Sequence, residues 1–406
     1  MRPHAVTGPP CPVVPTCQIP MEPTRLPNPR LHETMSRLED RVKIKDSCAR
    51  SLLLVAALLA SACAPEPLTP TSDVATGEAG QRIFAPDPRE VHFSELRMLT
   101  DGGENAEAYF SFDSSRLVFQ STRPPFGCDQ IFVMDADGSE PRLASTGQGR
   151  TTCAYFLPGD DRILYSSTHL GDPECPPKPD FSRGYVWPID PNYDIFTANP
   201  DGSEVVRLSD TPGYDAEATV SPRGDRIVFT SMRDGDLDIY SMNLDGSEVL
   251  RLTDEIGYDG GPFYSPDGTK IVYRARHPSE AEEIEDYQTL LAEGLIRPSK
   301  LEVWVMDADG TNQREVPDLG VAAFGPFFHP SGEQIIFSSN YGDPTGREFN
   351  LFMVNLDGSG LEQITFTEGF DGFPMWAPDG STFVFCSNRH NSKQGETNVF
   401  VTTWKP

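Results

Sequence analysis

Acidic residues stand at matched places just before short apolar runs of this chain, and basic residues stand at matched places after the following run. Two aromatic residues of a proline-rich segment, Tyr185 and Trp187, could wall the same region and stack on a ligand. Carboxylates beside guanidinium or imidazole groups suit a polar ligand, a sugar chain or a peptide segment. The candidate ligand-binding residues are Asp215, Asp259, Asp371, Arg123, Arg233, His169, His277, Arg389, Tyr185 and Trp187.

The same acids and bases also have a structural interpretation, as ion pairs and loop caps within the fold. His169 and His277 could ligate a transition metal, because imidazole is a common metal ligand. Asp215 and Asp259 could bind Ca²⁺ or serve as acid and base. A metal needs three or four converging donors, however, and Arg233 of the intervening repeat would repel a cation. We predict no catalytic residue and no resident cofactor, with Ca²⁺ or a transition metal as the alternative.

The absence of common enzyme motifs supports the prediction that the protein is not catalytic. The chain contains no Gly-x-Ser-x-Gly elbow, no His-Glu-x-x-His pair and no phosphate-binding glycine loop. The formal net charge of -28 argues against nucleic acid or an anionic bilayer surface as the main partner, because both attract Lys and Arg. Cationic, peptidic and sugar-like partners stay open.

The candidate ligand-binding residues lie in a sequence repeat, which must position them in the fold. Proline turns such as "SPRGD", "SPDGT" and "APDGS" alternate with Asp-Gly turns such as "SMNLDGSE" and "VMDADGTN". The proline turns and the Asp-Gly turns recur with the same spacing, roughly 44 residues in the shorter repeats. Runs with alternating apolar residues, typical of strands, lie between them. Four short strands in that length are the size of a propeller blade, because a small sheet must bury both faces against its neighbours. We predict an all-β, six-bladed propeller.

The two ends of the chain predict ring closure. The last repeat stops at Pro406 without a fourth strand, whereas "VHFSELRMLTDG" at 91–102 is a fourth strand that precedes the first repeat. The N-terminal strand is therefore expected to complete the last blade.

"LTDEIGYDGGPFYSPDGTKIVYRAR", followed by "VWVMDADG", resembles the WD-like repeats of TolB-type propellers, and the resemblance covers residues 91–406. It implies the propeller fold and says little about function. TolB, a soluble periplasmic component of the Tol-Pal envelope system, has an α/β domain ahead of its propeller, for which the segment before residue 91 leaves no room. Binding to the Pal lipoprotein is therefore not carried over.

Two repeats carry insertions of about twenty residues between their second and third strands, on one face of the ring. The first, in blade 2, is the proline-rich segment with Tyr185 and Trp187. The second, in blade 4, predicts a helix with Ser279 as N-cap, a stop at Gly294, and an apolar face. That face comprises Ile284, Tyr287, Leu290 and Leu291. The insertions could form a substrate lid or merely cap the ring.

The N-terminal region predicts export. Basic residues precede the apolar run "SLLLVAALLASA", which ends at Cys63 and is too short to span a bilayer. It resembles a lipoprotein signal, so residues 1–62 form a signal segment whose true start could be Met35, and Cys63 carries the lipid. Residues 63–90 form a flexible linker and residues 91–406 the propeller. Ala64 after the cysteine points to the outer membrane on the same analogy.

The remaining cysteines fit an oxidising compartment. Cys386 is expected in the core, whereas Cys128, Cys153 and Cys175 all fall on the insertion face, and three pairings are open. We favour a disulfide between Cys153 and Cys175.

The sequence as a whole favours an envelope-anchored, monomeric propeller that acts as a non-catalytic binding or scaffold module for a protein, peptide or glycan. The alternative is a periplasmic enzyme, a metal- or carboxylate-dependent lyase or hydrolase acting on an exported polysaccharide or peptide.

Overall fold

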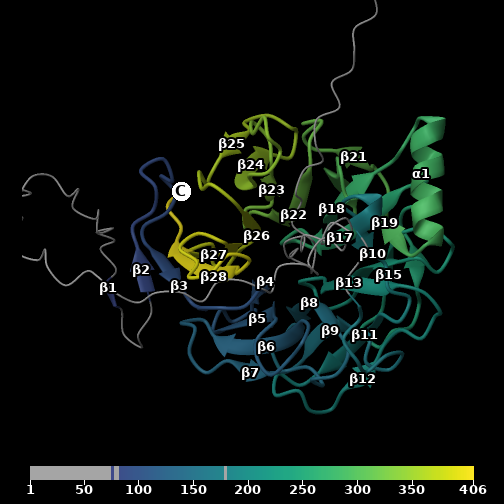
Figure 1. The fold of residues 1–406 in the computed structure, drawn as a ribbon, viewed down its shortest axis with the longest axis horizontal. Coiled ribbons are helices and arrows are strands. Elements are labelled where there is room, and N and C mark those ends of the chain that lie inside the picture. Colours follow the sequence, from purple (N-terminus) through teal and green to yellow (C-terminus); the bar gives the residue numbers. More distant parts are fainter. Residues whose placement is uncertain (1–74, 77–81, 178–180) are drawn as a thin grey trace, which may run out of the picture. The chain divides into compact units, whose positions relative to one another are not determined.

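The computed structural model describes residues 75–76, 82–177 and 181–406. Cys63 and the predicted signal segment lie outside these residues. Six antiparallel sheets of four strands or more follow one another around a ring (Figure 1), which confirms the predicted six-bladed propeller. No helix within the described ranges is both long enough and apolar enough to cross a membrane.

Five blades are each built from one continuous segment of the chain, with the innermost strand first, and the insertions of blades 2 and 4 add one short strand each outside the blade. Blade 1 contains β4 (Asn105–Phe110), β5 (Arg116–Ser121), β6 (Gln130–Asp135) and β7 (Arg142–Leu143). Blade 2 contains β8 (Thr151–Phe156), β9 (Ile163–Ser167), β11 (Asp194–Ala198) and β12 (Val206–Arg207). Blade 3 contains β13 (Asp215–Val220), β14 (Ile227–Ser231), β15 (Asp238–Met242) and β16 (Leu250–Arg251). Blade 4 contains β17 (Tyr258–Tyr264), β18 (Lys270–Arg276), β20 (Glu302–Asp307) and β21 (Arg314–Glu315). Blade 5 contains β22 (Ala323–Phe328), β23 (Gln334–Ser339), β24 (Asn350–Asn355) and β25 (Glu362–Gln363).

Blade 6 closes the ring with a strand from the other end of the chain. Strands β26 (Asp371–Trp376), β27 (Thr382–Ser387) and β28 (Asn398–Thr403) are followed by β3 (Leu96–Met98), which pairs Met98 with Phe400 and Arg97 with Val401. Figure 1 shows β3 in blue beside the yellow β28. The predicted closure by the N-terminal strand is confirmed. Beyond β3, the sheet continues with β2 (Arg82–Phe84) and β1 (Ala75–Thr76), so ordered sheet begins within the segment expected to be a linker.

The repeated turn is built from a short polar network. In blade 4, Ser265 Oγ donates to Asp267, whose carboxylate also accepts the backbone N–H of Thr269 at 3.0 Å. The N–H of Gly268 donates to the carbonyl of Ser265 at 2.8 Å, and Gly268 has a φ of +66°, which disfavours a side chain. The Pro-Asp-Gly signal therefore fixes a tight hairpin between the first two strands.

Each blade buries one large aromatic side chain at the same place of its second strand. These side chains are completely inaccessible to solvent, so they pack blade against blade. They are Phe119, Tyr165, Phe229, Tyr273, Phe337 and Phe385.

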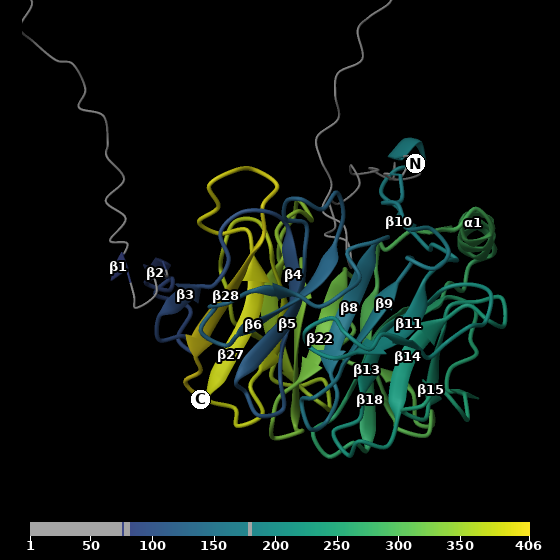
Figure 2. The same cartoon turned by 90° about the horizontal axis from the view of Figure 1, so that it is seen from below.

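The two insertions pair with each other. β10 (Trp187–Pro188) and β19 (Leu295–Ile296) form a small antiparallel sheet, and the N–H of Ile189 donates to the carbonyl of Gly294 at 2.7 Å. Figure 2 shows β10 and α1 (Ala281–Ala292) at the same end of the blade strands, here called the insertion face. A short 3₁₀ turn, η2 (Phe181–Arg183), precedes β10.

The structure corrects the predicted start of the helix. Its N-cap is Glu280 rather than Ser279, because Glu280 is the last residue with extended backbone, and it makes no side-chain capping bond. Leu290 and Leu291 are buried, which confirms part of the predicted apolar face, whereas Ile284 and Tyr287 are half-buried. Gly294, at φ +72°, follows the C-cap Glu293, in agreement with the predicted stop.

Candidate binding site in the central channel

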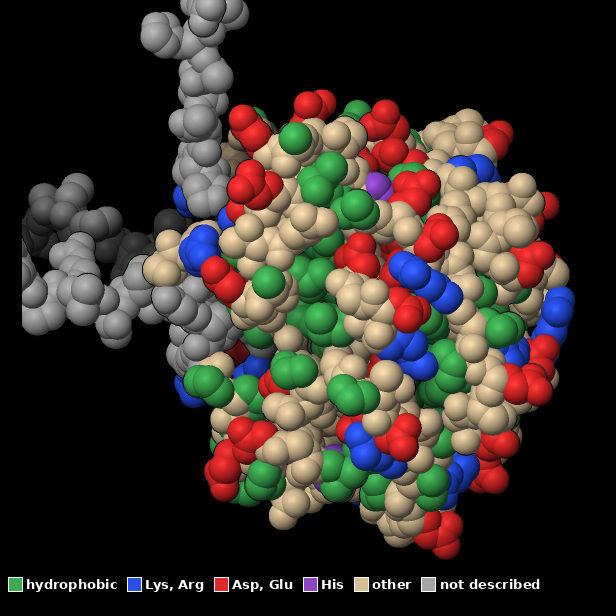
Figure 3. All heavy atoms as spheres, turned by 90° about the vertical axis from the view of Figure 1, so that its right-hand side faces the viewer, with side chains coloured by type: hydrophobic (Ala, Val, Ile, Leu, Met, Phe, Trp, Pro, Cys, Tyr) green, Lys and Arg blue, Asp and Glu red, His purple; other side chains and the backbone are tan. Residues whose placement is uncertain are grey.

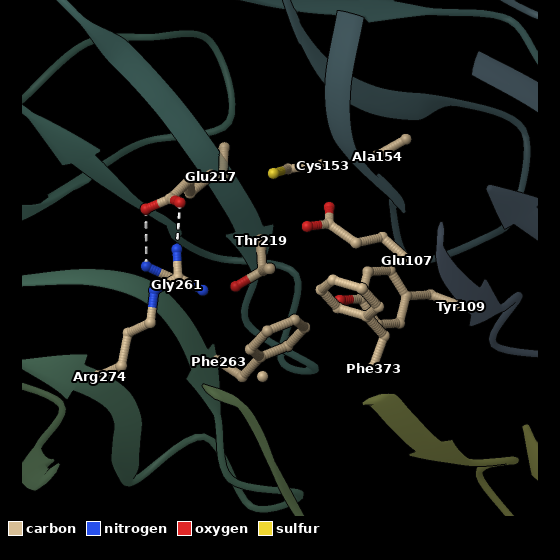
Figure 4. Close-up of a pocket in the computed structure, with 12 residues that line it drawn as sticks. Glu107, Tyr109, Cys153, Ala154, Glu217, Thr219, Gly261, Phe263, Arg274 and Phe373 are labelled. Atoms are coloured by element: carbon tan, nitrogen blue, oxygen red, sulfur yellow. Dashed lines mark hydrogen bonds and ion pairs between the residues drawn. The ribbon is translucent and has the colours of Figure 1, made fainter. Parts of the chain in front are cut away.

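One position recurs in the innermost strand of every blade. The third residue of that strand, or the fourth in the longer β17, lies at a β-bulge and has left-handed backbone, with φ between 52° and 60°. A bulge turns an extra side chain out of the regular alternation. All six residues line one cavity in the central channel (Figure 4). They are Glu107, Cys153, Glu217, Gly261, Gly325 and Phe373.

Glu217 of this ring forms a buried cluster with Arg274 of β18. Both side chains are almost inaccessible, at 4% and 3% exposure, and the guanidinium forms an ion pair with the carboxylate. The hydroxyl of Tyr258 accepts from Arg274 Nη2 at 2.7 Å and donates to Glu217 Oε2 at 3.1 Å. Burial disfavours the charge of Arg274, but Glu217 and Tyr258 outweigh that effect and hold the pKa of Arg274 above its usual range. The cluster is therefore a true ion pair inside the fold.

Two glycines make the space for this cluster. A Cβ on Gly260 would lie 2.2 Å from the Tyr258 hydroxyl, and one on Gly261 would lie 2.9 Å from Arg274 Nη1. The N–H of Gly261 also donates to Glu217 Oε2 at 2.9 Å. The "YDGG" of the fourth repeat thus admits an arginine between two blades. From the insertion, the Trp187 ring lies 5.5 Å from the Arg274 guanidinium.

Glu107 faces the same cavity from blade 1 (Figure 4). Its side chain is 4% exposed, and burial raises its pKa to about 7 from an ordinary 4.5. A hydrogen bond with Cys153 opposes this rise, and the negative charge of Glu217 adds to it. The cavity has a volume of about 20 Å³, enough for one water molecule or the tip of a side chain. Glu107 is thus a carboxylate that can gain or lose a proton near neutral pH.

The acids and bases predicted from the repeat lie one layer further toward the insertion face, and each pair lies within its own blade. The acids are buried, and their nearest bases are at hydrogen-bond distance. The three ion pairs are Asp215 with Arg233 at 3.0 Å, Asp259 with His277 at 2.9 Å, and Asp371 with Arg389 at 2.6 Å. Arg123 instead donates to Asn105 Oδ1 at 3.1 Å, and His169 contacts Ser167 Oγ at 2.8 Å.

These pairs have a clear structural role. The guanidinium of Arg233 donates to Ser231 and stacks over the ring of Phe229, and Arg389 also binds Glu90 at 3.0 Å. Burial acts against charge on His277, but its bond to Asp259 keeps its pKa above the usual value. The structure therefore brings each base to its own acid and does not gather the six into one open ring. Their binding of a ligand stays a prediction.

Tyr185 and Trp187 lie together, with Trp187 Nε1 donating to the Tyr185 hydroxyl at 3.1 Å. Trp187 is only 4% exposed, so it packs over the channel cluster rather than forming an open wall.

The predicted disulfide between Cys153 and Cys175 is wrong. Cys175 is bonded to Cys128, with their Cα atoms 5.7 Å apart. Cys153 is a thiol, because its position at the bulge of β8 turns it into the channel, away from the insertion loops.

A metal site with His169 and His277 has no geometric support within the described residues, since each histidine is held in its own blade. Among those residues, the group of acids close enough to share an ion is Glu302, Glu315 and Asp318. This acidic group lies apart from the channel cavity.

The chain is negatively charged overall. Figure 3 shows acidic side chains spread over the side of the molecule that carries α1, interspersed with fewer basic ones. With 61 acidic and 33 basic residues, the chain attracts cations at long range.

Comparison with known proteins agrees with the fold. The model of the TolB beta propeller domain matches residues 185–297. A segment of 67 residues is 39% identical to dipeptidyl-peptidase 5 of Porphyromonas gingivalis, and it covers 16% of this chain but only 10% of that relative. TolB from Acinetobacter baumannii superposes with a TM-score of 0.52 at 16% identity, covering 72% of this chain and 65% of that chain. The putative TolB from Agrobacterium tumefaciens gives 0.49 at 19% identity, covering 75% and 91%. The match to the TolB beta propeller domain therefore concerns residues 185–297, and the superposition on TolB from Acinetobacter baumannii agrees with the propeller fold.

Proposed function

We propose that this protein is an exported, non-catalytic binding module whose central channel receives a positively charged group of a peptide or protein partner. The observation that carries the proposal is that buried Glu107 lines the same cavity as the ion pair of Glu217 with Arg274. Arg274 balances the charge of one of the two carboxylates, Glu217, so ionised Glu107 gives the cavity a net negative charge that attracts a cation.

The energetics of this cluster support a functional role. Burying ion pairs and carboxylates contributes little net stability, and apolar residues of similar size often serve the core better. Strongly shifted pKa values also concentrate at functional sites. The small cavity favours the end of a lysine side chain or a peptide amine over a sugar ring.

A second candidate, acid–base catalysis, is favoured by one observation, the pKa of about 7 at Glu107. A periplasmic lyase or hydrolase would also need room for its substrate at that carboxylate. With a volume of about 20 Å³, the cavity offers no such room, so binding is the preferred function.

Export to the envelope is part of the proposal. The disulfide between Cys128 and Cys175 supports an oxidising compartment, and the likeness to TolB propellers supports the bacterial periplasm. We propose that a lipid on Cys63 anchors the protein, at the outer membrane, as a single propeller. Metabolic labelling with a radioactive fatty acid should mark the wild type and not Cys63→Ser.

Photo-crosslinking in the envelope tests the binding function. A photoreactive phenylalanine would replace Tyr341, which is 45% exposed and follows the second strand of blade 5 on the insertion face. We expect an adduct with a partner, weakened about tenfold by Glu107→Gln and unchanged by the exposed control Glu95→Gln. Adduct yield should rise from pH 6 to pH 8, since ionised Glu107 binds the cation. Equal yields in all variants and at both pH values would contradict the channel as the binding site.

A further inference from the structure

A second hollow lies beneath helix α1 on the insertion face. It has a volume of about 260 Å³ and is enclosed by α1, the end of β18 and the segment after β19. Its apolar wall includes Tyr258, Tyr287 and Ile296. The volume is just below the roughly 300–1,000 Å³ of sites for drug-sized ligands, so a small ligand would fill it.

Basic side chains of the hollow keep part of their hydrogen-bonding capacity. Arg276 Nη2 donates to Glu283 Oε2 at 2.8 Å, which uses one of its five N–H groups. Lys300 lies 4.0 Å from the same Glu283, and its side chain is 59% exposed. One carboxylate thus lies between two cations, and the ammonium of Lys300 is available to an incoming anion.

The hollow is also lined by carboxylates, one of which forms no ion pair within the described residues. Asp286 is engaged by Arg297 at 3.1 Å, whereas Glu282, in the first turn of α1, forms no ion pair with any residue that the structure describes. The charged lining of the hollow therefore includes a cation, Lys300, and an anion, Glu282, that can each contact a ligand group of opposite charge. A ligand with a single charge would leave one of them without a partner.

We propose that this hollow binds a small zwitterion, of the size of a free amino acid or a dipeptide. Its carboxylate contacts Lys300 and Arg276, its ammonium contacts Glu282, and its side chains lie on Tyr258, Tyr287 and Ile296. This site is separate from the channel cavity and goes beyond the proposed function.

Tyr258 connects the hollow to residues that line the channel cavity. The ring of Tyr258 lines the hollow, while its hydroxyl contacts Glu217 and Arg274 of the channel cluster. A ligand in the hollow would therefore touch the side chain that orients that cluster.

Isothermal titration calorimetry of the full chain tests the site with leucyl-leucine, N-acetyl-leucyl-leucine and leucyl-leucine amide. We expect the zwitterion to bind with a Kd below about 1 mM, and each singly charged form to bind about tenfold more weakly. Absence of heat with leucyl-leucine up to that concentration, or equal affinity for the three forms, would overturn the proposal.

Variants locate the binding. Lys300→Gln and Glu282→Gln should each weaken binding of leucyl-leucine about tenfold. Their controls, Lys393→Gln in blade 6 and Glu285→Gln on α1, change exposed residues outside the hollow and should leave the affinity unchanged. All four positions are at the surface, so folding is retained. Binding lost in Glu107→Gln but kept in Lys300→Gln would move the ligand to the channel and refute the hollow.

Discussion

Replacing Glu107 by glutamine should stabilise the protein above neutral pH. In the folded chain the pKa of Glu107 is raised to about 7 from 4.5, because burial removes the water that would stabilise its charge. A folded-state pKa above the unfolded one means that the folded protein holds the proton more tightly. Stability contributed by this group is thus largest at low pH and falls as the pH rises from 4.5 to 7.

The size of the effect follows from the difference of about 2.5 pH units. At about 1.4 kcal/mol per unit, ionised Glu107 lowers the free energy of unfolding by about 3 kcal/mol above pH 7. Glutamine has nearly the same shape and no charge to bury. Glu107→Gln should therefore gain up to about 3 kcal/mol at pH 8 and little at pH 4.5.

Urea unfolding of the full chain, followed by tryptophan fluorescence at pH 5 and pH 8, measures this difference. Glu95→Gln, at an exposed glutamate, is the matched control and should unfold like the wild type at both pH values. A gain of the same size at both pH values, or a loss at pH 8, would refute the assignment of the raised pKa to burial of Glu107.

Two further predictions concern bonds inside the fold. Arg274→Met should cost about 3–5 kcal/mol of unfolding free energy, because it leaves Glu217 buried without its cation, and Glu217→Gln should cost a similar amount. The double variant should cost far less than the sum; additive costs in a double-mutant cycle by urea unfolding would show that the two charges do not interact. Cys128→Ser should lose up to roughly 4 kcal/mol, because the disulfide closes a loop with a sequence separation of 47. Non-reducing peptide mapping should find Cys128 linked to Cys175 with Cys153 alkylated, and a Cys153–Cys175 peptide would disprove this pairing.

The repeat made the fold predictable from the sequence. Its turns keep one register along the chain, and a turn such as Ser265 to Gly268 is determined by local hydrogen bonds. The incomplete last blade likewise required a strand from elsewhere, and 91–102 was the segment with that pattern. Such turns can be predicted from the sequence because their hydrogen bonds join residues that are close together in the chain.

The channel residues were not recognised, although a signal for them exists. They stand five residues before the turn prolines, as Cys153 does before Pro158 and Glu217 before Pro222. Regular alternation would turn these side chains away from the axis, and only the bulge turns them into the channel. The acids two residues earlier, such as Asp215, recur in register with basic residues of the next strand. In the structure, however, each acid forms its ion pair within a single blade.

The disulfide was mispredicted for a related reason. All three cysteines follow the same face when the strands are drawn as regular, and Cys153 departs from it only through its left-handed backbone, at φ +52°. The ion pair of Arg274 with Glu217 depends on contacts between blades, which no single repeat reveals.

The ring closure also sets the order in which the blades can form as the chain folds. Blades 1 to 5 each come from one continuous segment of the chain and can form one after another, whereas β3 must wait for β28, which follows roughly 300 residues later. Until then Leu96 and Met98, which are 1% and 3% exposed in the finished fold, have no sheet to cover them. During this interval the segment exposes apolar side chains that favour aggregation, so formation of β28 ends the most vulnerable stage of folding.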